Sequence, residues 1–413
     1  MIHNKNNINW RTYSLISFIG IILITIISIL TKLWILTAIP IGFLFGFFLQ
    51  KGDLCGSSAF SEVIMMKDRR KIFGIWILIT VAMLGFALLD LFGLVKLNPK
   101  PFFFLNYIIG GIIFGAGIVL SGGCISGCLY KGATGNLNSI AALLTIPVGV
   151  MLVEFGPLHD LHIFLKQYVL KTNDGSVLSL PALFGLPFWV IAIMFGFITF
   201  LGIFKFYKRG SSKQIKKYSD ESLYQRLMTR PWKPWVAGLA IGLLMIPSYL
   251  SSASSGRNYP LGVTHGVMQI ELLVIDHGLN HVWKPKVSVD SDKNTGLKDK
   301  PEIQKFSGDQ KPTGKKVVWW LVALCLSLML GAWVSGRMSG QVKLLPKPPD
   351  EVLIAISGGL LVGTGAAIAG GCVVGNIMSG WALLSVGSFL FGIITMLSNW
   401  ITTYFYMMGA QYK

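Results

Sequence analysis

The sequence predicts an all-α polytopic membrane protein built from two inverted repeats, with broken helices whose central loops meet near the membrane midplane. Three observations lead to this prediction. Of the 413 residues, 53% are hydrophobic and 13% are charged, about half the charged fraction of soluble domains. Apolar runs long enough to span a bilayer follow one another along the chain. A glycine-rich motif also occurs twice, at corresponding places in the two halves.

Composition and charge exclude several other classes of protein. The apolar content is too high for intrinsic disorder. The net charge of +18 comes from basic residues in the polar gaps between apolar runs, as expected for cytoplasmic loops. We therefore expect the lipid bilayer, and no nucleic acid, as the partner of this charge. Five cysteines, most of them in apolar or glycine-rich stretches, argue against a disulfide framework.

The first apolar run, from Tyr13 to Leu30, has no small-residue cleavage site after it. We interpret it as a retained span that follows a cytoplasmic N-terminus, not as a signal peptide. Residues 1–33 therefore form an extra N-terminal segment before the first half, residues 34–206. The apolar runs of that half are 33–49, 72–95, 102–120, 137–155 and 180–206.

A basic linker, residues 207–234, leads to the second half, residues 235–413. Its apolar runs are 235–250, a segment ending near 283, 317–336, 353–369 and 381–408. Counting crossings places the linker and Lys67–Lys71 inside, so the second half begins inside and the matching segment of the first half outside. The halves are therefore predicted to be inverted, which is typical of transporters. The count also places the lysine-rich loop 284–316 outside, against the positive-inside rule.

The repeated motif reads G-x-G-x-x-x-x-G-G-C-x-x-G, over 115–127 and again over 363–375. Each copy follows a Pro-Lys-Pro turn and a span. Paired glycines predict a break in the helix at membrane depth, where unpaired peptide groups cost several kcal/mol each unless protein or a polar cavity satisfies them. The amides of the helix restarting after each cysteine favour an anion at the break. The glycine pairs are Gly122–Gly123 and Gly370–Gly371. Elsewhere glycine more simply serves close helix packing, which is our interpretation of Gly42, Gly46, Gly238 and Gly242.

Three cysteines, Cys55, Cys124 and Cys372, each lie at such an interruption. Cys325 lies within a span and is expected to be structural, whereas Cys128 has no partner in the second repeat and its role stays open. Three thiols could bind a soft metal, but His, Met and acidic residues do not cluster near them. We expect no metal and no other cofactor. Buried thiols stay neutral and are weak S–H donors, which suits a soft, sulfur-bearing anion.

Histidines offer a second, weaker possibility. His265, His277 and His281, together with Asp276, could form a proton relay for a coupled transporter.

Five segments resemble the YeeE/YedE thiosulfate-transporter family. They follow one another in the family's order between about residues 34 and 405: Ile41–Phe60, Asn98–Pro101, Leu120–Gly127, Ser255–Thr264 and Ala369–Gly375.

The resemblance implies uptake of thiosulfate across the bacterial inner membrane by an hourglass of two inverted halves. It also implies three functional cysteines, which by motif are Cys55, Cys124 and Cys372, and a small TusA-like sulfurtransferase as partner. The first span, the 284–316 loop and Cys128 depart from shorter members. Some relatives are linked to selenium metabolism.

We therefore expect a transporter and not an enzyme, with no catalytic residues. Cys124 would receive the anion, with Cys55 and Cys372 flanking it, and pass it on through weak S–H contacts without a persulfide. The expected substrate-binding residues are Cys55, Cys124, Cys372, Gly122, Gly123, Gly370, Gly371 and Arg257.

Three alternatives remain open at this point. The first is a transporter for selenium compounds or other sulfur compounds. The second is a membrane thiol redox sensor or sulfurtransferase that uses Cys124 and Cys128 as a pair. The third is a purely structural subunit.

Overall fold

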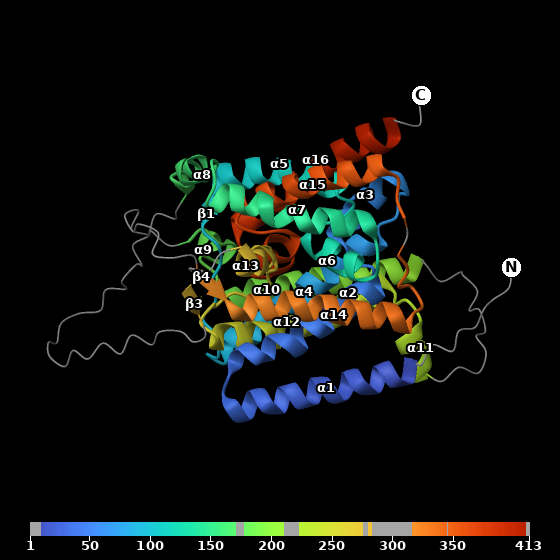
Figure 1. Cartoon of the computed structure of the whole chain (residues 1–413). Helices are drawn as coiled ribbons and strands as arrows, with labels where there is room; N and C mark the ends of the chain where they lie inside the picture. The colour runs from blue at the N-terminus through green and yellow to red at the C-terminus, as the bar shows by residue number, and fades with distance from the viewer. Residues whose placement is uncertain are drawn as a thin grey trace.

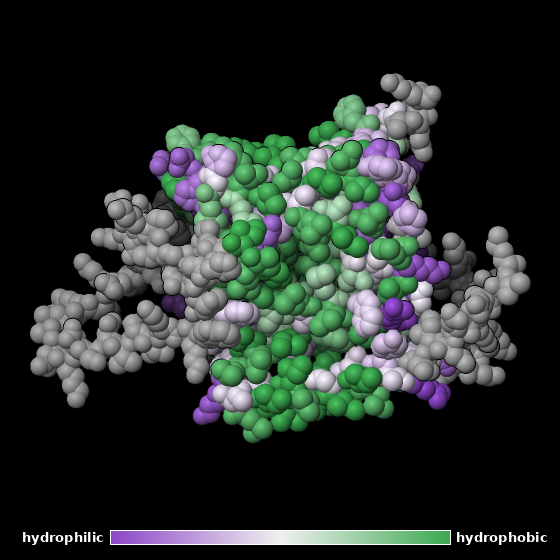
Figure 2. All heavy atoms as spheres, viewed as in Figure 1, coloured by the Kyte–Doolittle hydropathy of each residue, from purple (hydrophilic) through white to green (hydrophobic). Residues whose placement is uncertain are grey.

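The computed structural model describes residues 10–170, 177–209, 223–275, 280–282, 316–344 and 346–409. Within these ranges, nine helices are long and apolar enough to cross a membrane. Figure 1 shows the long helices running side by side. Figure 2 shows apolar residues over the middle of the visible face and hydrophilic residues toward the two ends of the helices. The chain is an all-α polytopic membrane protein, as predicted.

The helices up to the basic linker follow the apolar runs closely. In chain order they are α1 (Trp10–Thr31), η1 (Trp34–Thr37), α2 (Ala38–Gly52), α3 (Gly56–Met65), α4 (Arg70–Leu91), α5 (Phe104–Leu120), α6 (Ile125–Ala133), α7 (Leu137–Glu154), α8 (His159–Lys166), α9 (Leu180–Phe184) and α10 (Phe188–Arg209). Two short strands, β1 (Phe102–Phe103) and β2 (Val169–Leu170), pair antiparallel.

The remaining elements lie after the linker. They are α11 (Leu223–Thr229), α12 (Pro234–Ser254), α13 (Thr264–Ile275), α14 (Trp319–Met338), α15 (Pro349–Ile368), η2 (Val373–Gly380), α16 (Val386–Thr403) and η3 (Tyr404–Met408), with parallel strands β3 (Asn280–Val282) and β4 (Lys316–Val318). Both η2 and η3 are π-helices. The predicted loop 284–316 lies outside the described residues except for Lys316.

The long helices form two bundles, and each bundle takes two helices from each half of the sequence. One bundle contains α2, α4, α12 and α14, and the other contains α5, α7, α15 and α16. In the first, α2 packs on α14 and α12 packs on α4; in the second, α5 packs on α16 and α15 packs on α7. Four short helices, α3, α6, α13 and η2, each contact at least one helix of each bundle. They therefore lie between the bundles, as Figure 1 shows for α6 and α13.

Glycine brings the helices of the first bundle into close contact. A Cβ at Gly46 on α2 would overlap the Leu328 carbonyl on α14, and a Cβ at Gly238 on α12 would overlap the Gly74 carbonyl on α4. Gly42 and Gly242 meet the same partner helices in the same way. The prediction that these four glycines serve close packing is confirmed.

One boundary differs from the prediction. Residues 180–206 were expected to form one span, but α9 ends at Gly185, whose φ is +63°, and Pro187 precedes the start of α10. A left-handed residue followed by proline cannot continue a helix. The extra N-terminal span is α1, which packs at the edge of the first bundle against α14, α2 and α11 (Figure 1).

The glycine contacts give a test of the packing. We expect Gly46→Ala to lower the free energy of unfolding by about 1–3 kcal/mol, because the added methyl group would overpack the α2–α14 contact. Gly20→Ala on α1 is the matched control, since nothing lies within 4 Å of a Cβ there. Thermal unfolding of the purified variants measures the difference. Equal midpoints for the two variants would contradict the close packing.

Candidate functional site

The three predicted breaks are present together with a fourth at Gly256, and each begins a short helix between the bundles. Chain reversal at the breaks uses left-handed residues: Asp53 has φ +46°, Gly122 +68°, Gly256 +89° and Gly370 +64°. Glycine adopts this conformation without steric cost, which explains the first glycine of each G-G-C motif.

Each of the three predicted cysteines is the N-cap of one short helix. Cys55 precedes α3, Cys124 precedes α6 and Cys372 precedes η2, and all three are extended in backbone and fully buried. No cap side chain accepts a hydrogen bond from the first turn of these helices. The first amides of a helix lack intrahelical partners and carry a partial positive charge. The breaks therefore present amide donors suited to an anion.

The thiols of Cys55 and Cys124 lie within hydrogen-bonding contact of each other. Gly127 makes this approach possible, because a Cβ there would overlap Cys55 Sγ and lie 3.6 Å from Cys124 Sγ. Cys124 Sγ is also 3.3 Å from the Ser126 hydroxyl. Two thiols from different breaks thus share one small space.

The third break packs directly against the first. A Cβ at Gly56 would lie 2.7 Å from Cγ2 of Val373, so the residue after Cys55 meets the residue after Cys372. The structure therefore brings all three cysteine-bearing breaks together.

Lysine side chains donate hydrogen bonds to backbone carbonyls at both G-G-C breaks. Lys131 Nζ donates to the Gly122 carbonyl at 2.9 Å, and Lys100 Nζ donates to the Gly370 carbonyl at 2.7 Å. Lys100 also donates to Asn376 Oδ1 at 2.7 Å. Neither lysine was predicted as a site residue. Only Lys100 carried a signal, as the middle residue of the first Pro-Lys-Pro turn.

Cys128 and Asn376 occupy corresponding positions, each four residues after a break cysteine. Cys128 Sγ donates to the Gly123 carbonyl at 3.6 Å, and Asn376 Nδ2 donates to the Gly371 carbonyl at 2.9 Å. Cys128 therefore does have a counterpart in the second repeat, in the form of an amide side chain.

Cys325 is buried on α14, and its sulfur donates to the Val263 carbonyl at 3.7 Å. It therefore contacts the break before α13, which has no cysteine of its own. This contact joins segments that are distant in the sequence and was not predicted.

A basic pocket of about 220 Å³ lies beside the Gly370–Gly371 break. Liquid water occupies about 30 Å³ per molecule, so the pocket has room for a small hydrated anion. Its lining includes the predicted residues Arg257, Gly370 and Gly371, with Lys100, Tyr259, Gly262, Thr264, His265, Leu321 and Gly375. No carboxylate lines it among the residues that the structure describes.

The two cations of the basic pocket are held by aromatic rings and carbonyls. Arg257 donates to the Pro260 carbonyl at 2.8 Å and lies over the rings of Tyr259 and Trp320. Lys100 Nζ lies 5.1 Å from the Tyr259 ring centroid. Burial lowers the pKa of Lys100 to about 7. Lys100 therefore titrates near neutral pH.

His265 also lines the basic pocket, and its Nε2 lies 3.5 Å from Glu154 Oε1 on α7. Of the predicted relay, Asp276 and His277 lie outside the described residues. His265 therefore has a carboxylate partner that the sequence pattern did not indicate.

The surroundings of the Cys55 break differ in charge from the basic pocket. Lys71 Nζ bonds Asp53 Oδ2 at 2.5 Å and Glu62 Oε1 at 2.6 Å, and Tyr130 donates to Asp53 Oδ1 at 2.7 Å. Carboxylates thus offset the cation at the Cys55 end, in contrast to the basic pocket at the Cys372 end.

Comparison with known proteins assigns the chain to a family. The model of a family described as "Sulphur transport" matches residues 51–401. The chain belongs to this family. One relative is a "Thiosulfate transporter TsuA" of Spirochaeta thermophila, which is 29% identical over 88% of this chain and 96% of its own length. Another is a "Thiosulfate transporter TsuA" of Escherichia coli, which is 26% identical over 92% of this chain and 96% of its own length. A "Probable transporter YedE" of Escherichia coli is 31% identical over 23% of each chain. The resemblance to the YeeE/YedE family is thereby confirmed.

The charge of Lys100 gives a pH test of the basic pocket. Because its pKa is lowered to about 7, Lys100 is charged at pH 6 and neutral at pH 9. We expect the affinity for thiosulfate to fall about tenfold over that interval, in line with the loss of one charged hydrogen bond of about 1.5–3 kcal/mol. Titration calorimetry at several pH values measures how the affinity changes with pH.

Lys100→Arg is the control for this test, since a guanidinium keeps its charge over the same range. Its affinity should stay nearly level. The same slope in wild type and variant would show that another group causes the pH dependence.

Proposed function

We propose that this protein takes up thiosulfate across the bacterial inner membrane through a central path lined by Cys55, Cys124 and Cys372. The observation that carries the proposal is the meeting of three short helices whose N-caps are these cysteines. Membership of the sulphur-transport family and the printed names of the two full-length relatives support the same substrate class.

The direction of the path follows from charge. Basic residues at Lys67–Lys71 and around the linker favour an inside location for the N-terminal end of α4. The loop after α4, which carries Lys100, then lies outside. The basic pocket accordingly collects the anion from outside, beside Gly370 and Gly371, and delivers it past Cys372.

The cysteine side chains form the next part of the proposed path. Cys124 and Cys55 offer weak S–H donors to a soft anion, and the amides after each cysteine offset part of its charge. Several weak sites favour conduction over trapping. No covalent persulfide is needed, because the anion keeps its own sulfur–sulfur bond throughout.

Entry of a dianion needs a driving force. A negative interior of 100 mV opposes two charges by about 5 kcal/mol. We propose that a small TusA-like sulfurtransferase on the inner side consumes the product and keeps its concentration low. His265 and Glu154, beside the basic pocket, are candidates for coupling to protons.

The two halves, residues 34–206 and 235–413, are proposed to be inverted repeats, joined by the linker 207–234 and preceded by the extra segment 1–33. The paired contacts of the bundles support this: α2 with α14 corresponds to α12 with α4, and α5 with α16 corresponds to α15 with α7. The two G-G-C breaks support it further, because in each a lysine donates to the carbonyl of the first glycine and the side chain four residues after the cysteine donates to that of the second.

The primary test is uptake of labelled thiosulfate into proteoliposomes. We expect uptake by the wild type, and none above protein-free liposomes for Cys124→Ala, because the central S–H donor is lost. Cys325→Ala is the matched control for a buried cysteine outside the path. Unlabelled thiosulfate should compete better than sulfate or selenite.

Other outcomes of this test favour the alternatives. Stronger competition by selenite would identify a selenium-compound transporter. No uptake, together with a mass increase of about one sulfur on a cysteine, would indicate a sulfurtransferase using a nucleophilic thiol. Unchanged uptake in Cys124→Ala would overturn the cysteine path.

The contact between two thiols gives a second test. Gly127→Ala places a methyl group where Cys55 Sγ lies, so we expect uptake to fall about tenfold or more, given that overpacking typically costs about 1–3 kcal/mol. Gly132→Ala on the same helix is the control, because a Cβ there meets only ordinary contacts at 3.6 Å or more. Equal uptake by the two variants would show that the Cys55–Cys124 contact is dispensable.

A further inference from the structure

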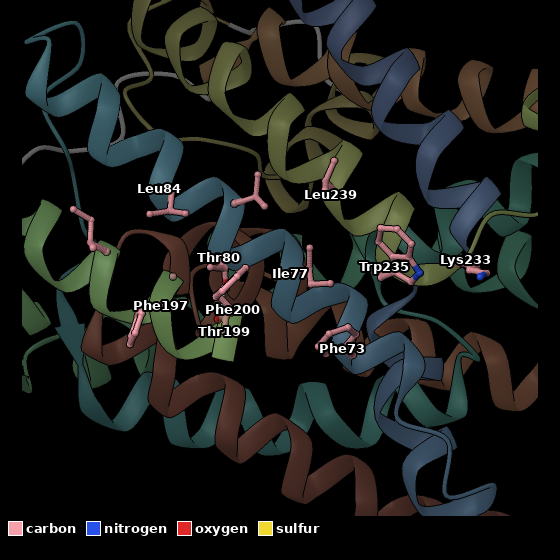
Figure 3. A pocket seen from close by; sticks show the side chains of 13 residues that line it. Phe73, Ile77, Thr80, Leu84, Phe197, Thr199, Phe200, Lys233, Trp235 and Leu239 are labelled. Carbon is pink, nitrogen blue, oxygen red and sulfur yellow. Dashed lines mark hydrogen bonds between the residues drawn. The ribbon is translucent and has the colours of Figure 1, made fainter. Parts of the chain in front are cut away.

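A large apolar groove lies apart from the central path, on the outer surface of the first bundle. α4 forms its floor, and α10 and α12, which both pack on α4, form its walls. Its volume is about 910 Å³. Figure 3 shows the side chains that line it, among them Phe73, Ile77 and Leu84 of α4, Phe197 of α10 and Trp235 of α12.

The polar groups in the groove are already satisfied. Trp76 Nε1 donates to Thr199 Oγ1 at 2.9 Å, and the hydroxyls of Thr80 and Thr199 are 3.2 Å apart. Each threonine hydroxyl also donates to a carbonyl of its own helix. The groove therefore offers hydrocarbon contact and no free polar partner along its length, which suits an acyl chain.

The length of the groove matches one leaflet of a bilayer. Along α4 it extends from Phe73 to Leu84. Eleven residues of helix rise about 16 Å, close to half of a hydrocarbon core of about 30 Å. It occupies the N-terminal half of α4, which begins at Arg70.

One end of the groove carries a charged and an aromatic residue. Lys233 and Trp235, both exposed, lie at the end nearest Phe73 (Figure 3). A tryptophan beside a lysine is typical of the headgroup level of a membrane. No acidic residue lines the groove in the described part of the chain, so this end attracts an anionic headgroup.

We propose that this groove binds an anionic phospholipid, with one acyl chain between α10 and α12 and its phosphate at Lys233. The site holds the lipid in the leaflet that faces the basic linker. Its occupancy is independent of whether thiosulfate is the substrate.

Native mass spectrometry tests the proposal with two lipids, dioleoyl phosphatidylglycerol and dioleoyl phosphatidylcholine, added to the delipidated full chain. We expect the wild type to retain one phosphatidylglycerol in preference to phosphatidylcholine. Gly196→Leu fills the groove and should lower retention of both lipids. Gly202→Leu on the same helix is the control, since nothing lies within 4 Å of a Cβ there.

The charge of Lys233 is tested separately. Lys233→Gln should reduce the preference for phosphatidylglycerol about fivefold, the effect of one lysine near an anionic surface. Arg69→Gln removes an exposed cation at the start of α4 that does not line the groove and should keep the preference. Equal lipid retention by Gly196→Leu and Gly202→Leu, or an unchanged preference in Lys233→Gln, would overturn the proposal and indicate surface lipid only.

Discussion

Every break in a helix inside the membrane exposes peptide groups that water cannot satisfy, and the central site of this protein is organised around that constraint. Side chains donate hydrogen bonds to the carbonyls at the G-G-C breaks. Lys131 and Lys100 donate to the carbonyl of the first glycine of each pair, and Cys128 and Asn376 donate to that of the second. The amides after the cysteines receive no such bond from the cap. Amide donors without a side-chain cap suit an anion.

The same constraint explains the architecture around the site. Short helices that begin at a break cannot span the membrane alone, so they need long helices on both sides. α3 and η2 contact α4 and α16, while α6 and α13 contact α14 and α7. Glycine contacts such as Gly46 against Leu328 bring the long helices close enough to enclose them.

The positions of the breaks could be predicted because the glycine pairs and the cysteines beside the interruptions are local features of the sequence. The spans followed from apolar runs for the same reason. The bond of Lys100 to the Gly370 carbonyl could not be predicted, since the two residues are 270 residues apart in the chain. The contact of Cys55 with Cys124 depends on how two breaks pack, as does the contact of Cys325 with Val263. Within residues 180–206, hydropathy concealed the turn at Gly185, because its neighbours are apolar too.

The sharing of both bundles between the two halves has a consequence for biosynthesis. α2 packs on α14, and these two helices are separated by some 270 residues of chain. The glycine face of α2 therefore enters the bilayer long before its partner has been translated. Contacts so distant in sequence form slowly and leave unfinished surfaces exposed meanwhile. Neither half can complete a bundle alone, so final assembly must wait until α16 has left the ribosome. A nascent chain truncated after α10 should accordingly stay open to proteases and to the insertion machinery.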